Sequence, residues 1–67
     1  MYEKELKEEL TKMWDDRDFA RGVLLCLETD AQRREILNGV KDGTLYRPRL
    51  VVSRAMEMAG YATKTVE

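Results

Sequence analysis

The segment Val23-Leu24-Leu25-Cys26-Leu27 places five apolar side chains in a row, in a chain of which 37% of the residues are charged. An amphipathic surface helix needs an apolar stripe on one side only, and one helical turn takes about 3.6 residues. Five consecutive apolar residues therefore cover more than a full turn. If this segment is helical, neighbouring helices or a second copy of the chain must cover it from nearly every side.

A chain of 67 residues forms one domain at most. Domains of this size bury only about 60% of the surface that their unfolded chains expose, so they usually need a disulfide, a metal ion or self-association. Cys26 is the only cysteine and the chain has no histidine, which argues against an internal disulfide and a structural zinc site. We therefore expect regular helix packing or a homodimer, and neither a metal nor another cofactor.

The lone cysteine suits a reducing compartment, and no basic segment followed by an apolar one marks a signal peptide. The longest apolar stretch also falls far below the roughly 20 residues that a membrane-spanning helix needs. The sequence therefore predicts a soluble, cytoplasmic protein without a membrane partner.

Residues 2–14 have the apolar spacing of one helical face, with Glu-before-Lys pairs four positions apart between the apolar residues. The apolar positions are Tyr2, Leu6, Leu10, Met13 and Trp14. Aspartates at three of the positions 15–18 suit the N-cap and first turn of a further helix. We expect a break near 14–16 and a second helix over about 16–28. One continuous helix over 2–28 stays open, because neither Pro nor Gly interrupts the first 21 residues.

The second helix contains Gly22, and a glycine inside a helix costs about 1 kcal/mol relative to alanine. The close approach of another helix would explain this glycine. Leu25 and Cys26 extend the apolar surface around the far side of the same helix. If helices of this chain cover that pair, the protein is a compact monomer; if they do not, the pair is where a partner binds.

Thr29 and Gln32 have the spacing of a capping box, and Gly43 suits a left-handed helix end. These signals predict a third helix over about 30–42. We expect its inward positions to be Ala31, Ile36, Leu37 and Val40. Asn38-Gly39 favours a hairpin turn instead, but the run that follows is too short and polar for a convincing strand.

Pro48 suits the first position of a fourth helix over about 48–59, and Gly60 ends that helix. An extended conformation over 44–52 is the alternative, because Leu-Val-Val has strand propensity and a proline disfavours helix in the residue before it.

Together these patterns predict an all-α fold, with three to four short helices around a central apolar helix at about 16–28. Residues 1–60 form a single domain in this interpretation. Residues 61–67 are predicted to be a frayed tail, with Tyr61 tucked back onto the domain.

The sequence offers little for catalysis. It contains no histidine, the commonest general base, and Ser53 has no base paired with it in sequence. Cys26 lies between two leucines, which predicts a buried and unreactive thiol. Asp16-Arg17-Asp18 begins like a calcium loop, but the turn glycine and the bidentate glutamate of such loops are missing. We therefore expect a protein that is not an enzyme.

Charge is unevenly distributed along the chain. Residues 1–16 hold three lysines and six acidic residues, a net charge of −3, whereas residues 33–54 hold six basic and two acidic residues, a net charge of +4. Such asymmetry either marks a binding face for an acidic partner or is neutralised within the fold or across a dimer. The candidate partner-binding residues are Arg33, Arg34, Tyr46, Arg47, Arg49 and Arg54.

Tyr46 with Arg47 and Arg49 has the composition of an interface hot spot, although an apolar lid over the third and fourth helices is an alternative role for the tyrosine. Met56 and Met58 lie two positions apart and do not share one helical face, so we expect one of them at an interface or in solvent. The candidate self-association residues are Leu25, Cys26, Met56 and Met58.

These observations favour a small, non-catalytic regulatory or adaptor protein that binds other proteins and forms a homodimer. The alternative is a nucleic-acid-binding regulator with a helix-turn-helix-like unit, in which the helix over 48–59 presents its arginines. Against this alternative, the sequence pI is about 5.5 and the first helix is acidic. The loop from Gly43 to Pro48 is also longer than the turn of that motif.

Overall fold

The computed structural model describes residues 2–60, and within them the chain forms four helices. They are α1 (Glu3–Met13), α2 (Arg17–Cys26), α3 (Asp30–Asp42) and α4 (Pro48–Met58). The prediction of an all-α fold is confirmed, and the chain breaks between α1 and α2 as the aspartates indicated. The hairpin at Asn38-Gly39 and the extended alternative over 44–52 are wrong, because α3 runs through the first and α4 begins within the second. The predicted tail over 61–67 lies outside the described residues.

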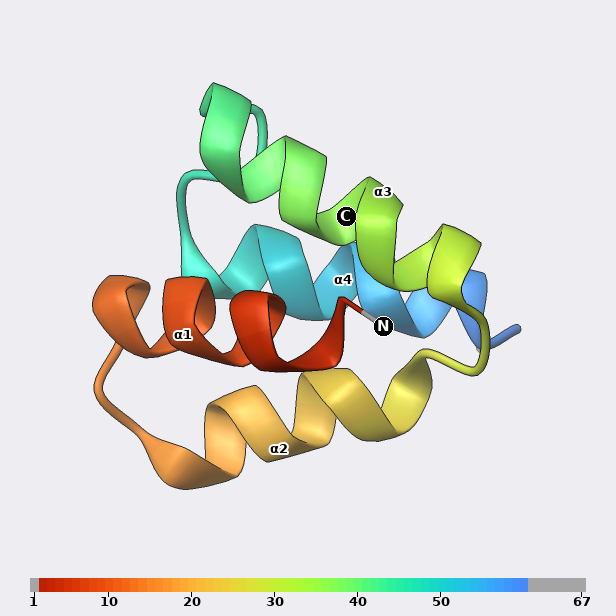
Figure 1. Ribbon diagram of the computed structural model, residues 1–67, viewed down its shortest axis with the longest axis horizontal. Coiled ribbons are helices and arrows are strands. Elements are labelled where there is room, and N and C mark those ends of the chain that lie inside the picture. The colour runs from red at the N-terminus through yellow and green to blue at the C-terminus, as the bar shows by residue number, and fades with distance from the viewer. Residues whose placement is uncertain (1, 61–67) are drawn as a thin grey trace.

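Each helix makes its main contacts with two others, so that the helices follow one another around a ring in the order α1, α2, α4, α3. In Figure 1, α2 and α4 run in the same direction, opposite to α1 and α3. The N-terminal ends of α2 and α4 therefore lie on the same side of the molecule.

The core fills the inside of this ring and takes side chains from all four helices and from Leu27. Its buried members are Leu6, Leu10, Phe19, Ala20, Val23, Leu27, Ile36, Leu37, Val51 and Ala55. Leu6, Leu10, Ile36 and Val51 are 0% exposed. Truncating a leucine or isoleucine at such a position costs about 2–5 kcal/mol, because both contacts and packed volume are lost.

The apolar segment over 23–27 is only partly covered by this arrangement. Val23 and Leu27 face the core and are 2% and 3% exposed, whereas Leu25 is 76% exposed. Leu24 and Cys26 are half-buried against the edge of the core. The reason is that α2 packs mainly against α1 and α4, which leaves its outer side without a neighbouring helix.

Three further expectations need correction. Ala31 was expected to face inward and is exposed, because the first turn of α3 extends beyond the core. Trp14 was expected on the buried face of the first helix, but α1 ends at Met13 and the tryptophan is 49% exposed. No atom of a neighbouring helix lies within 4 Å of a Cβ built at Gly22, so none of the other helices in residues 2–60 makes the expected close approach.

The helix ends follow the local signals. The Asp16 carboxylate accepts hydrogen bonds from the backbone N–H groups of Asp18 (2.9 Å) and Phe19 (3.4 Å), which caps α2. Gly43 ends α3 with a φ of 89°, a left-handed conformation that glycine adopts without steric cost. Pro48 stands in the first turn of α4, as predicted.

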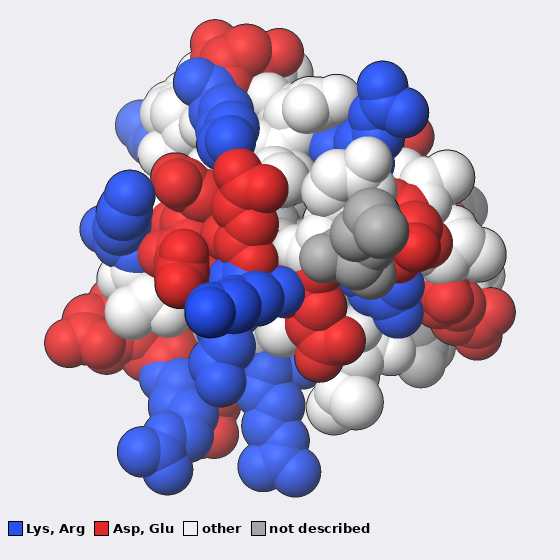
Figure 2. Space-filling model, viewed as in Figure 1, with Lys and Arg blue, Asp and Glu red and all other residues white. Residues whose placement is uncertain are grey.

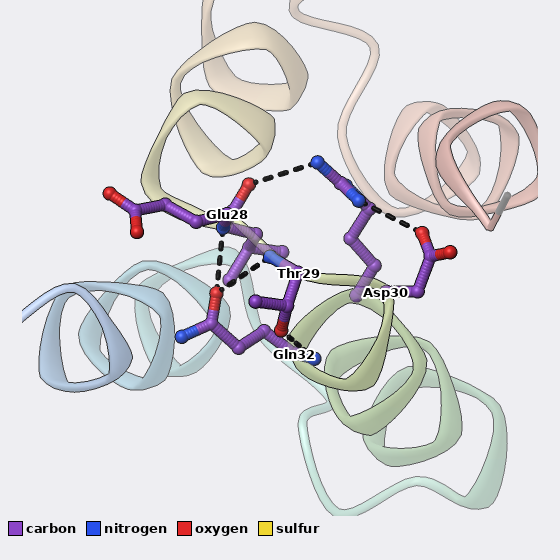
Figure 3. Close-up of polar contacts among 6 residues, drawn as sticks. Glu28, Thr29, Asp30 and Gln32 are labelled. Atoms are coloured by element: carbon purple, nitrogen blue, oxygen red, sulfur yellow. Dashed lines mark hydrogen bonds and ion pairs between the residues drawn. The ribbon is translucent and has the colours of Figure 1, made fainter.

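The start of α3 holds three helices together (Figure 3). Thr29 and Gln32 form the predicted capping box: Thr29 Oγ1 accepts from the Gln32 N–H at 3.2 Å, and Gln32 Oε1 accepts from the Thr29 N–H at 3.1 Å. The amide nitrogen of Gln32 also donates to the carbonyl of Met58 in α4, at 3.4 Å. Arg33 donates to the carbonyl of Leu27, just beyond α2, at 3.3 Å.

For a single copy of the chain, we expect Gly22→Ala to raise the free energy of unfolding by about 1 kcal/mol, because the new methyl group gains helix propensity and meets nothing among residues 2–60. Gly39→Ala is the matched control, since its Cβ would lie 2.7 Å from Leu45 Cδ1 and 2.8 Å from Leu45 Cγ. Urea denaturation measures both. An equal gain from the two substitutions would contradict the close packing of Leu45 on α3.

Thr29→Ala removes one half of the capping box and is expected to lower the free energy of unfolding by about 1 kcal/mol. Thr11→Ala, the same substitution inside α1, serves as control, because the Thr11 hydroxyl only donates back to the Lys7 carbonyl on an exposed surface. Thermal or urea denaturation of the two variants tests this difference. If Thr29→Ala were as stable as the wild type, the cap would contribute nothing.

Candidate functional site

A groove with a volume of about 700 Å³ lies where the end of α1 meets the beginning of α4. Its lining side chains are Met13, Trp14, Arg47, Pro48, Arg49, Val52, Ser53 and Met56. Trp14 follows the last residue of α1 and Arg47 precedes the first residue of α4, so two helix ends position this part of the surface.

A second depression, of about 350 Å³, continues from the first between α2 and α4. Its lining side chains are Asp18, Phe19, Gly22, Val23, Cys26, Val52, Ala55 and Met56. Because Val52 and Met56 line both depressions, the two form one continuous surface. We call this surface the α2–α4 groove.

Large apolar side chains gather in and beside the α2–α4 groove. Within residues 2–60, four large hydrophobic side chains are exposed, and Trp14 (49%) and Val52 (37%) line the groove. Tyr46, 64% exposed, packs its ring 5.3 Å from the guanidinium carbon of Arg47 and lines a neighbouring depression that shares Met13 with the groove. The Trp14 ring is held by Phe19, with 5.3 Å between the ring centroids.

The two sides of the α2–α4 groove carry opposite charges. Arg47 and Arg49 stand on the α4 side, and neither forms an ion pair with the part of the chain that the structure describes. Asp18 stands on the α2 side. The two arginines lie at the N-terminal end of α4 and the aspartate lies at the N-terminal end of α2. The positive and negative sides therefore face each other at one end of the groove.

The other predicted partner-binding arginines lie apart from this groove. Arg54 forms ion pairs with Glu35 of α3 and with Glu57, and the hydrogen bonds to Glu35 and then Glu57 raise the pKa of Arg54. Arg33 is half-buried and pairs with Asp30 at 2.9 Å. Arg34 is exposed on α3. The structure therefore brings together Tyr46, Arg47 and Arg49 from the predicted set, and places the remaining three elsewhere.

Part of the charge asymmetry is neutralised inside the fold. Lys41 of α3 pairs with Glu5 of α1, and this hydrogen bond raises the pKa of the lysine. Figure 2 shows acidic side chains gathered over α1 and basic ones along the edge formed by α2. The ion pair between α1 and α3 involves neither Arg47 nor Arg49.

The predicted self-association residues are divided among three environments. Cys26 and Met56 both line the α2–α4 groove. Leu25 belongs to a different depression, on the side where α2 meets α1, and Met58 packs against the core. Cys26 is half-buried rather than fully buried, since the groove leaves one side of the thiol open.

The sequence-based prediction missed Trp14 and Val52 as members of the site. A signal for Val52 was present, because Val51 and Val52 are consecutive on a helix and do not both face the core. No comparable signal existed for Trp14, whose exposure depends on where α1 ends and on the distance to Phe19.

Comparisons of the chain with protein-family models, with curated proteins and with solved structures found no match. None of the four helices described here has the length and apolar character that crossing a membrane requires. Among residues 2–60, no three Cys, Asp or Glu side chains are grouped closely enough to hold a metal ion.

The structure separates arginines that form ion pairs from arginines that form none among residues 2–60. We expect Arg54→Ala to lower the free energy of unfolding by about 0.5 kcal/mol, as is usual for exposed ion pairs, and less at high salt. Arg49→Ala, the same substitution five positions earlier in α4, should leave the stability of a single copy of the chain unchanged because it breaks no ion pair among residues 2–60. Urea denaturation at two salt concentrations measures this contrast, and equal losses would refute it.

Proposed function

We propose that this protein is a small, non-catalytic regulatory or adaptor protein that binds another protein through the α2–α4 groove. The observation that carries the proposal is the composition of that surface. Aromatic residues, methionine and arginine are enriched in protein interfaces, and Trp, Tyr and Arg dominate the binding energy at hot spots. Trp14, Tyr46, Met56, Arg47 and Arg49 lie together on or beside the groove.

The energetics of such a surface favour burial. Trp14 and Val52 expose apolar area to water, and covering that area yields roughly 25 cal/mol per Å². Arg47 and Arg49 lie at its edge, where charged groups improve specificity and association rate more than affinity. An apolar centre with a charged edge is the usual anatomy of a protein interface.

Nucleic-acid binding is the competing function, since Arg47 and Arg49 stand near the start of α4, where a recognition helix contacts bases. Two observations weigh against it. Asp18 lies on the opposite side of the groove, and Arg54 of the same helix is engaged with Glu35 and Glu57. Phosphate binding favours a continuous basic face instead.

The proposal is tested by chemical cross-linking in the cells that produce the protein. Replacing Arg47 and Arg49 together by glutamate should abolish the cross-linked protein complexes. Replacing Arg17 and Arg21 by glutamate is the matched control, because it makes the same charge change on the far side of α2, and should preserve the complexes. Circular dichroism confirms that both variants fold.

Two outcomes would contradict this proposal. If complexes survive the change at Arg47 and Arg49 but disappear with Arg17 and Arg21, the binding surface lies elsewhere. If the purified protein shifts duplex DNA in a gel and the affinity falls steeply with salt, the nucleic-acid function replaces the proposed one.

A further inference from the structure

We infer that a second copy of the chain occupies the α2–α4 groove, in a symmetric dimer in which α4 of each protomer lies along α2 of its partner. This inference rests on the proposed function, because it names the protein that the groove binds. Three features of the groove lead to it: its opposite charges, the open space at Gly22, and its uncovered apolar centre.

The charges make the groove complementary to itself. A twofold axis along the groove places the α4 side of one protomer against the α2 side of the other, and every contact then occurs twice. Since α2 and α4 run in the same direction, the N-terminal end of α4 in one protomer lies beside the N-terminal end of α2 in the other. Arg49 would then face Asp18 of the partner subunit, and Asp18 would face Arg49 of the partner subunit. A partner with a single sign of charge would be repelled by one of the two sides.

Gly22 indicates that the occupant is a helix. It lines the groove on the α2 side, and a Cβ built there meets nothing within 4 Å. A glycine on a helix face lets another helix backbone approach closely, and none of α1, α3 and α4 of the same chain does so. In the proposed dimer, α4 of the partner subunit fills this space, which gives the otherwise unfavourable glycine a structural role.

The centre of the interface is apolar and continuous. Val52 and Met56 line both depressions, and Trp14 and Cys26 stand toward its two ends. Pairing two copies buries these side chains in both protomers. This burial provides the additional apolar contact that a chain of 67 residues usually needs beyond its own core.

Sedimentation and charge exchange test the inference. The wild-type chain at micromolar concentration should sediment as a particle of twice 7.8 kDa, with an association that weakens at high salt. Arg49→Asp and Asp18→Arg should each weaken the dimer by about tenfold or more, because each places like charges together at two sites. Mixing the two variants should restore the association, as a mixed pair regains both opposite-charge contacts.

Two further variants separate loss of association from loss of folding. Gly22→Gln improves helix propensity, so the fold should be no less stable, while its side chain blocks the approach of α4 and weakens the dimer by about tenfold or more. Leu25→Glu lies outside the groove and should leave the dimer unchanged. Alkylation of Cys26 should slow as the protein concentration rises, because the thiol lines the groove that the second copy covers in the dimer.

A chain that sediments as a monomer throughout overturns this inference, and so does a dimer that Leu25→Glu breaks while Gly22→Gln does not. Failure of the mixed variants to associate overturns the pairing of Arg49 with Asp18. None of these outcomes decides the proposed function. If the protein cross-links to a different protein, and replacing Arg47 and Arg49 abolishes that cross-link, the groove binds a protein other than a second copy.

Discussion

The side chains of Leu6, Leu10, Ile36 and Val51 meet at the centre of the molecule and are completely buried there. They come from α1, α3 and α4, and α2 closes the ring through Phe19, Ala20 and Val23. A ring of four short helices around so small a core buries one face of each helix. The outer faces remain available, and the properties of the surface follow from which residues lie on them.

This constraint explains why one surface combines apolar, aromatic and charged groups. The inner face of α4 holds Val51 and Ala55, which leaves Val52 and Met56 on the side toward α2. The end of α1 adds Trp14, supported by Phe19. The arginines before and within the first turn of α4 form no ion pair with a carboxylate among residues 2–60.

The same constraint decides which charged side chains form ion pairs within the fold. Lys41 and Arg54 lie where helices approach one another and find carboxylates on α1 and α3. Exposed pairs of this kind contribute little to stability, typically below about 1 kcal/mol. Their main effect is to neutralise part of the basic 33–54 region, which leaves Arg34, Arg47 and Arg49 without an ion pair among residues 2–60.

The sequence by itself determined the helices and most of their ends. The capping box at Thr29 and Gln32, the cap at Asp16 and the left-handed Gly43 are local interactions, set by residues within a few positions of one another. The core positions Leu6, Leu10, Ile36 and Leu37 follow from helical spacing for the same reason.

Only the tertiary structure decided what the remaining apolar and charged residues do. Cys26 and Met56 lie thirty positions apart in sequence but share the groove, whereas Leu25, next to Cys26, faces solvent. Arg54 of α4 forms an ion pair with Glu35 of α3, whereas Arg49, also in α4, forms no ion pair with a carboxylate in residues 2–60. The physical reason is that spacing along a helix determines which residues share a face, whereas only the packing of the helices determines which groups that face contacts.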